Sequence, residues 1–210
     1  MSAATEAARF AELGVSTVYE AAGRRGLIDA DLVQIVPGSR VAGPARIAFC
    51  GQSDNRAVHA VMARVQPGEV IVISMPEPRP IGVIGELLVT QAHVHGAAGI
   101  LVDAAVRDVD ELRQIGLPIW SRWIRSTGAT KDARGELDVE VEVGGTRIRP
   151  ADYVVLDTDG AVAVPRDRVD EVLAASQARF DREAAMRKRL EAGELSYDIH
   201  GLRAKDADGS

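Results

Sequence analysis

Cysteine is nearly absent from this chain of 210 residues. The single cysteine, Cys50, cannot form a disulfide within the chain, and such cysteine usage is typical of a reducing compartment. No apolar run is long enough to span a membrane. Residues 1–10 also lack the apolar segment with basic flanks that marks a secretory signal. We therefore expect a cytoplasmic protein with no membrane partner.

An excess of basic charge is absent as well. The formal net charge is −6 at pH 7, whereas proteins that coat nucleic acid usually carry net positive charge. The composition, with 46% hydrophobic and 27% charged residues, is that of an ordinary globular protein. A chain of this length can bury a sizeable core as one domain. We therefore expect a globular protein with no nucleic-acid partner.

The common short motifs of metal and nucleotide sites are missing too. His93 and His95 are two positions apart on a predicted helix, so they face different directions and cannot bind one metal together. An H-E-x-x-H pattern and a cysteine cluster are absent, which argues against zinc. The glycine-rich loops of nucleotide binding and the G-x-S-x-G of hydrolases are absent as well. The remaining candidates for a functional site are carboxylate and arginine side chains and helix starts that follow a glycine.

Strand and helix patterns alternate through the middle of the chain. A short helix is predicted to begin at Ser16 or Thr17. Strands are predicted after it at 40–50, 66–74, 99–106 and 117–124. Helices are predicted between them at 54–65, 84–99 and 107–116. This alternation predicts an α/β fold with at least partly parallel strands. Residues 137–165 alternate with period two around two glycine turns, which predicts an antiparallel section. Residues 166–193 have the spacing of a long amphipathic helix.

Two groups of residues at predicted helix starts are candidates for a site. Gly85 precedes a helix whose first N–H groups lack partners and can bind a carboxylate or phosphate, and Glu86 lies in its first turn. Arg107 and Asp108 follow the strand 99–106 at its carboxyl end, where ligands gather in open α/β sheets. Arginine suits a substrate carboxylate, and Mg²⁺ often takes only one or two protein carboxylates.

These residues also have plain structural interpretations. Asp108, three positions before Glu111, matches a capping box, so it could serve only as a helix cap. Glu86 is favoured in a first turn by the helix dipole. The residues alone leave both interpretations open.

At these residues the chain resembles a known family. The family comprises the class II pyruvate aldolases that cleave 4-hydroxy-4-methyl-2-oxoglutarate and 4-carboxy-4-hydroxy-2-oxoadipate, with the regulators of ribonuclease activity A (RraA) as a sister group. The aldolase signature is an acidic residue, twenty intervening residues and then Arg-Asp, which here is Glu86 followed by Arg107 and Asp108. Further segments that resemble the family lie at 53–73, 85–120, 128–145, 149–173 and 187–203.

The resemblance implies a fold and an assembly. The fold is a single α/β domain of mixed β layers and helices, similar to swivelling phosphohistidine domains, with a long C-terminal helix. The assembly is a homotrimer, often stacked into a hexamer, with sites between subunits. We therefore divide the chain into an α/β domain (1–165), a C-terminal helix and arm that pack on a neighbouring subunit (166–202), and a disordered tail (203–210).

The resemblance also implies a role for each candidate residue. Asp108 would bind Mg²⁺ or Mn²⁺, Arg107 would bind the substrate, and Glu86 would order a metal-bound water and assist proton transfer. After Gly85, the backbone amides of Leu87 and Leu88 would hold the pyruvyl carboxylate.

A glutamate on a neighbouring subunit's C-terminal helix completes the site in the family. Glu183 is the candidate for this glutamate, and its alternative role is an ion pair with Arg187 on the helix surface. The predicted site offers no lysine for a Schiff base, so we expect Lys131 to be structural or to position the substrate.

The implied activity is the metal-dependent retro-aldol cleavage of a 4-hydroxy-2-oxo acid to pyruvate and a second oxo acid. The same enolate chemistry predicts oxaloacetate decarboxylation as a side activity. Two alternatives stay open. One is a non-catalytic regulator that binds ribonuclease or another protein, although such regulators commonly lack the complete signature found here. The other is a related metal-dependent lyase or hydrolase that acts on another oxo acid.

Overall fold

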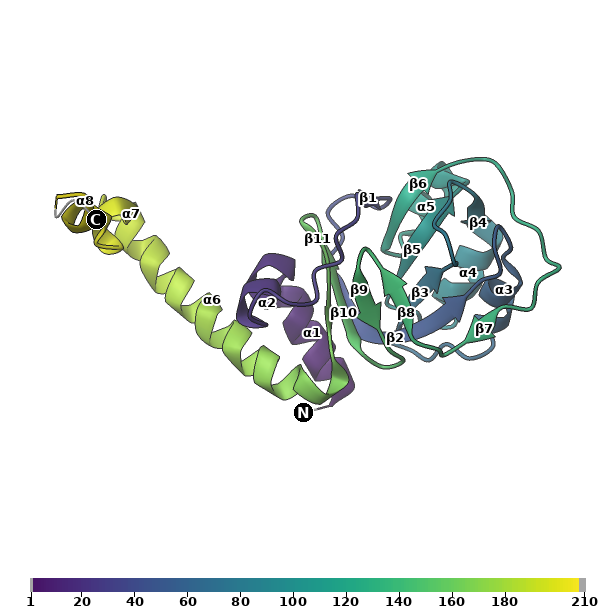
Figure 1. The fold of residues 1–210 in the computed structure, drawn as a ribbon, viewed down its shortest axis with the longest axis horizontal. Coiled ribbons are helices and arrows are strands. Elements are labelled where there is room, and N and C mark those ends of the chain that lie inside the picture. Colours follow the sequence, from purple (N-terminus) through teal and green to yellow (C-terminus); the bar gives the residue numbers. More distant parts are fainter. Residues whose placement is uncertain (1, 208–210) are drawn as a thin grey trace.

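A mixed sheet of nine strands forms the centre of the computed structural model, which describes residues 2–207 (Figure 1). The strand order is β1-β6-β5-β3-β2-β10-β11, with β4 beside β5 and β7 beside β2. The strands of this sheet are β1 (Val33–Gln34), β2 (Val41–Phe49), β3 (Val70–Ser74), β4 (Gly82–Ile84), β5 (Gly99–Val106), β6 (Ile119–Ile124), β7 (Glu136–Leu137), β10 (Tyr153–Asp157) and β11 (Gly160–Val164). β8 (Val141–Val143) and β9 (Thr146–Ile148) form a separate hairpin.

The sheet is parallel in its middle and antiparallel at both ends of the strand order. β2, β3, β5 and β6 pair in parallel. At one end β10 pairs antiparallel with both β2 and β11, and at the other end β1 pairs antiparallel with β6. The α/β fold with partly parallel strands is therefore confirmed, as is the antiparallel section. All eight residues of β5 are buried, as expected for a central strand covered on both faces.

Helices cover the sheet in two groups. The helices are α1 (Ala3–Leu13), α2 (Val15–Ala21), α3 (Arg56–Val61), α4 (Glu86–Val94), α5 (Val109–Ile115), the 3₁₀ turn η1 (Arg166–Arg168), α6 (Val169–Glu191), α7 (Ser196–Ile199) and α8 (Leu202–Ala207). Alternate residues of β3 face opposite ways: Ile71 and Ile73 pack with α3, α4 and α5, and Val70 and Val72 pack with the β8–β9 hairpin. A third apolar cluster joins α1, α2 and the start of α6 to β10 and β11.

Three local features differ from the sequence prediction. The helix expected from Ser16 or Thr17 begins at Val15, and a further helix, α1, precedes it. Gly14, with φ +81°, separates the two helices. A short strand, β4, occupies residues just before Gly85, so α4 begins at Glu86.

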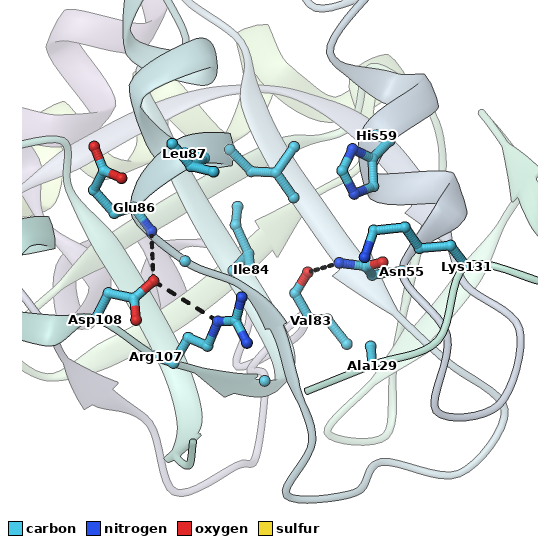
Figure 2. A pocket seen from close by; sticks show the side chains of 13 residues that line it. Asn55, His59, Val83, Ile84, Glu86, Leu87, Arg107, Asp108, Ala129 and Lys131 are labelled. Carbon is cyan, nitrogen blue, oxygen red and sulfur yellow. Dashed lines mark hydrogen bonds and ion pairs between the residues drawn. The ribbon is translucent and has the colours of Figure 1, made fainter. Parts of the chain in front are cut away.

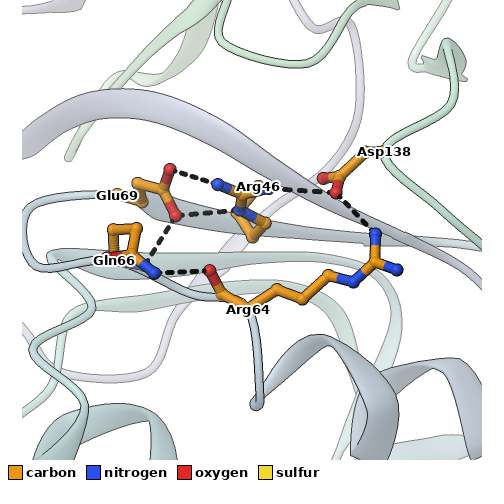
Figure 3. A network of polar contacts seen from close by, with 5 residues as sticks. All are labelled: Arg46, Arg64, Gln66, Glu69 and Asp138. Carbon is orange, nitrogen blue, oxygen red and sulfur yellow. Dashed lines mark hydrogen bonds and ion pairs between the residues drawn. The ribbon is translucent and has the colours of Figure 1, made fainter.

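Arg46 on β2 ties three segments together through a network of ion pairs (Figure 3). Its guanidinium donates to both carboxylate oxygens of Glu69, at 2.9 and 2.8 Å, and to Asp138 Oδ2 at 2.9 Å. The Glu69 side chain is only 14% exposed. The hydrogen bond to Glu69 is the main reason why the pKa of Arg46 is raised. The network therefore fixes β2 against the turn before β3 and the segment after β7.

The long helix α6 extends away from the sheet and carries α7 and α8 at its end (Figure 1). Its buried residues lie in the first two turns, from Val169 to Ser176, and Phe180 is already 37% exposed. Residues 203–207 of the expected disordered tail belong to the helix α8, and 208–210 lie outside the described residues. Within the described part of the chain, no helix is both long and apolar enough to cross a membrane.

Candidate active site

Two strand–helix junctions meet at one edge of the sheet. β4 runs parallel to β5, with Ile84 opposite Val106, and the Arg107 N–H donates to Ile84 O at 3.1 Å. Parallel strands end at the same edge, so Gly85, which follows β4, lies beside Asp108. The structure thus brings together the two groups of residues, Gly85–Glu86 and Arg107–Asp108, that twenty residues separate in the sequence.

The Asp108 side chain caps the helix α4 and not α5, the helix that directly follows it in the sequence. Its Oδ2 accepts a hydrogen bond from the Glu86 N–H at 3.1 Å, whereas it makes no side-chain cap to α5 (Figure 2). The predicted capping box with Glu111 is therefore wrong. Asp108 has φ +60° and ψ +42°, the left-handed conformation. That conformation is uncommon for residues other than glycine and is best tolerated by Asn and Asp.

Gly85 makes room for the Asp108 and Arg107 side chains, and two further glycines, Gly82 and Gly128, lie beside Arg107. A Cβ atom on Gly85 would lie 2.3 Å from Asp108 Oδ2 and 3.0 Å from Arg107 Cγ. A Cβ on Gly82 or Gly128 would meet Arg107 Cδ at 3.6 Å or Nη1 at 3.3 Å. Arg107 Nε lies 3.7 Å from Asp108 Oδ2, so the two charges form a loose ion pair with half of the Arg107 side chain exposed.

These side chains line a cavity of about 370 Å³ (Figure 2). The sequence-predicted residues that line it are Gly85, Glu86, Leu87, Leu88, Arg107 and Asp108. The N–H groups of Leu87 and Leu88 have no acceptor within residues 2–207. Among the described residues, the Glu86 carboxylate accepts a single, long hydrogen bond, from Thr90 Oγ1 at 3.4 Å. The cavity therefore presents two free backbone donors, a guanidinium and two carboxylates.

The opposite wall contains two residues that sequence reasoning missed, Asn55 just before α3 and His59 within it (Figure 2). Lys131, on the loop after β6, lines the same wall, where it could position a substrate, one of the two roles expected for it. Asn55 Nδ2 donates to Val83 O at 2.9 Å, and its buried Oδ1 has no partner among the described residues. The four-residue spacing of Asn55 and His59 indicates a shared helix face, but nothing in the sequence directs that face toward Arg107.

Asp54 holds the Lys131 loop in place. Its buried Oδ2 accepts hydrogen bonds from Thr130 Oγ1 at 2.6 Å and from the N–H groups of Asp132 and Ala133 at 2.7 and 3.1 Å. Burial by itself raises the pKa of Asp54, but these bonds and one from the Arg56 N–H outweigh it and lower the pKa to about 2. Asp54 therefore stays ionised and fixes the Thr130 side chain before Lys131 and the backbone of the two residues after it.

Glu183 does not reach this cavity within one chain. It lies on α6 and pairs with Arg179, at 2.8 Å between Nε and Oε1, and not with Arg187 as the surface alternative expected. Its contribution from a neighbouring subunit stays a prediction.

His93 and His95 do not line the cavity either. The described residues contain no group of three or more His, Cys, Asp or Glu side chains that could hold a metal ion.

Comparison with known proteins shows the family of the chain. Residues 15–163 match the family described as "RraA-like: Aldolase/RraA". A protein of Halalkalibacterium halodurans, named "Putative 4-hydroxy-4-methyl-2-oxoglutarate aldolase", is 34% identical over 166 residues, which cover 79% of this chain and 76% of that protein.

Two solved structures share the fold. RraAS2 of Streptomyces coelicolor, described as an unusual member of the RNase ES inhibitor RraA family, has a TM-score of 0.77 and 29% identity over 87% of this chain and 96% of its own. The RNA-processing inhibitor RraA from Thermus thermophilis has a TM-score of 0.65 and 24% identity over 71% of this chain and 91% of its own. Since the family match spans more than half of the sequence, the chain belongs to the RraA-like family of aldolases and RraA proteins.

Proposed function

We propose that this protein is a divalent-metal-dependent carbon–carbon lyase that cleaves a 4-hydroxy-2-oxo acid to pyruvate and a second oxo acid. The observation that carries the proposal is the meeting of Asp108, Arg107 and the free N–H groups of α4 in one cavity. The name of the Halalkalibacterium halodurans relative supports the aldolase branch of the family.

The carboxylates fit Mg²⁺ or Mn²⁺ better than a metal that needs many protein ligands. Asp108 Oδ2 is occupied by the Glu86 N–H, but Oδ1 has no hydrogen-bond partner among residues 2–207. With no cluster of three ligands in the described residues, the site suits a cation that keeps several waters. When bound, such a cation acts as a Lewis acid that polarises the substrate's keto oxygen.

The remaining chemistry is assigned to this chain's own residues. The substrate carboxylate accepts hydrogen bonds from the Leu87 and Leu88 N–H groups at the positive end of α4. Glu86 activates a water that removes the proton from the C4 hydroxyl. The C3–C4 bond then breaks, C4 becomes a carbonyl, and the electron pair forms the pyruvate enolate. Arg107 stabilises the negative charge on this enolate, which takes a proton at C3 to give pyruvate.

The far wall of the cavity is suited to the other end of the substrate. Lys131 and His59 lie there, and Asn55 Oδ1 offers an unpaired acceptor. A second carboxylate of the substrate would bind Lys131, which Asp54 holds in position. Oxaloacetate decarboxylation is expected as a side activity, because loss of CO₂ yields the same pyruvate enolate. A homotrimer or hexamer, with Glu183 of a second copy at the site, belongs to the same proposal.

The deciding experiment is a pyruvate-release assay across 4-hydroxy-2-oxo acids and oxaloacetate, with and without Mg²⁺. The variant is Asp108→Asn, because Asn tolerates the left-handed conformation and can still accept from the Glu86 N–H. The matched control is Asp110→Asn, whose side chain is 86% exposed. We expect turnover to require Mg²⁺, to stop with EDTA, and to be lost only in Asp108→Asn. Metal-independent turnover, or full activity of Asp108→Asn, would refute the proposal.

A second candidate function follows from the likeness to RraAS2. A non-catalytic regulator would bind a ribonuclease of the RNase E type without releasing pyruvate from any substrate. A pulldown with such a ribonuclease, run beside the assay, separates the two functions.

A further inference from the structure

A second cavity, distinct from the candidate site, is lined by four arginines in a chain whose net charge is −6. Its volume is about 370 Å³, and it shares no lining residue with the first cavity. Arg25 follows α2, Arg147 lies on β9, Arg149 follows β9, and Arg168 ends η1. The lining contains one carboxylate, that of Asp152.

The segments that carry Arg25 and Arg147 are fixed to the sheet and to each other. Gly26, next to Arg25, accepts a hydrogen bond from the Ala163 N–H of β11 at 2.8 Å, and a Cβ on Gly26 would lie 2.1 Å from Ala163 O. Gly26 also has φ +82°, so this position requires glycine. Thr146, next to Arg147, donates from Oγ1 to the Leu27 carbonyl. The cavity walls are therefore preformed.

Asp152 joins the other two walls and makes no ion pair with the four arginines, although its charge adds to the effect of the hydrogen bond to Glu140 in raising the pKa of Arg149. It is 7% exposed, its Oδ2 accepts from the Arg149 N–H at 2.8 Å, and its Oδ1 accepts from the Arg166 N–H at 2.9 Å. Both carboxylate oxygens are therefore engaged by backbone donors. The side chain holds the turn at Arg149 against the segment that leads to Arg168.

Two of the four guanidinium groups lack a close acidic partner. Arg149 pairs with Glu140 at 2.7 Å, and Arg168 pairs with Glu171 through two hydrogen bonds at 2.7 and 3.1 Å.

By contrast, Arg147 reaches Glu140 only at 3.9 Å, and Arg25 makes no hydrogen bond or ion pair within residues 2–207. The hydrogen bond from Arg168 is the main reason why the pKa of Glu171 is lowered, and the charge of Arg25 adds to this effect. Four cations therefore line one cavity, and two of them have unused donors.

We propose that this cavity is a binding site for a small polyanion with at least two anionic groups, either a polycarboxylate or a phosphate-bearing compound. A guanidinium binds a carboxylate or phosphate through two parallel hydrogen bonds. Arg25 and Arg147 stand on different segments, so one ligand would need an anionic group for each. The proposal is independent of the reaction assigned to the first cavity.

The test is isothermal titration calorimetry of the full chain with citrate and with pyrophosphate as probes. The variants are Arg25→Gln and Arg147→Gln. The control, Arg9→Gln, removes the same charge from an exposed ion pair on α1. We expect one of the probes to bind, with each cavity variant weakening it about tenfold or more and the control leaving it unchanged. Binding should also weaken as ionic strength rises.

The comparison of the two probes identifies the chemistry of the ligand. Tighter binding of citrate indicates a polycarboxylate, and tighter binding of pyrophosphate indicates a phosphate compound. The proposal is overturned if neither probe binds, or if both cavity variants bind as the wild type does. It is also overturned if Asp108→Asn abolishes binding, because the probes would then occupy the first cavity. Melting curves of each variant show that the fold is retained.

Discussion

Gly85→Ala is the change that most sharply tests the placement of Asp108. Gly85 has φ −148° and ψ −164°, an extended conformation that alanine adopts without strain. The effect must therefore come from the added methyl group, which would lie 2.3 Å from Asp108 Oδ2, whereas ordinary contacts begin at 3.4 Å. The carboxylate sits at the end of a short side chain and can swing away, so the fold should survive while the site changes.

The expected magnitudes follow from this geometry. The Asp108 carboxylate must move by roughly 1 Å, and a displacement of that size in a reacting group costs about 100-fold in rate. The hydrogen bond to the Glu86 N–H is lost as well, which resembles the loss of a helix cap and costs about 1 kcal/mol. In a chain of this size that loss lowers Tm by about 2–4 °C. We thus expect a large loss of turnover with a small loss of stability.

The assay combines Mg²⁺-dependent pyruvate release, Mn²⁺ binding followed by electron paramagnetic resonance, and thermal melting. Gly128→Ala is the matched control, because its Cβ would meet only Arg107 Nη1, at 3.3 Å, the mobile end of a long side chain. The control should keep nearly all of its activity and metal binding. Wild-type turnover and Mn²⁺ binding in Gly85→Ala would show that the position of Asp108 against α4 is irrelevant to the reaction.

Three further predictions concern proton transfer, acid stability and packing. Glu86→Gln should lower the turnover number about 100-fold or more while retaining Mn²⁺ binding; unchanged turnover would remove Glu86 from the mechanism. The pKa of Asp54 is lowered from 3.8 to about 2, so its stabilisation is present above pH 4 and lost as the pH falls from about 4 to about 2. Urea unfolding of Asp54→Asn should lack this pH dependence, and an unaltered profile would contradict the assignment. Arg46→Ala leaves Glu69 without its cation and leaves Asp138 with only the longer ion pair to Arg64, at 3.4 Å. It should cost about 3 kcal/mol, measured by urea unfolding against Arg9→Ala, which should cost less than 1 kcal/mol.

The sequence predicted those elements whose residue pattern is strong. β5 is an unbroken apolar run that ends at Arg107, and the structure buries all of it. The glycine turns of the antiparallel section are found between β8 and β9 and between β10 and β11. In each case neighbouring residues alone carry the pattern, so no knowledge of distant contacts was required.

The missed features depend on short segments or distant contacts. β4 has three residues, too few for any periodicity to appear, yet it places Gly85 beside Asp108. The helix α1 was also missed, although its alanine and glutamate residues favour helices and Ser2 caps it. Phe10 on this helix is completely buried, a tertiary contact that the local pattern does not show. The link from Asp54 to the Lys131 loop joins residues more than seventy positions apart, which no local pattern reveals.

The geometry of the fold is enough to explain why twenty residues separate Glu86 from Arg107, so this spacing does not by itself indicate chemistry. α4 leads away from the end of β4, and β5 returns to the same edge, so one strand–helix–strand unit accounts for the spacing. A protein that only keeps this unit would keep the spacing without any activity. Under the proposed function, the chemistry would come from Asp108 Oδ1, which has no partner among residues 2–207, and the far wall at Lys131 would select the substrate. Substitutions at Asp108 and Lys131 therefore distinguish an aldolase from a regulator better than the spacing does.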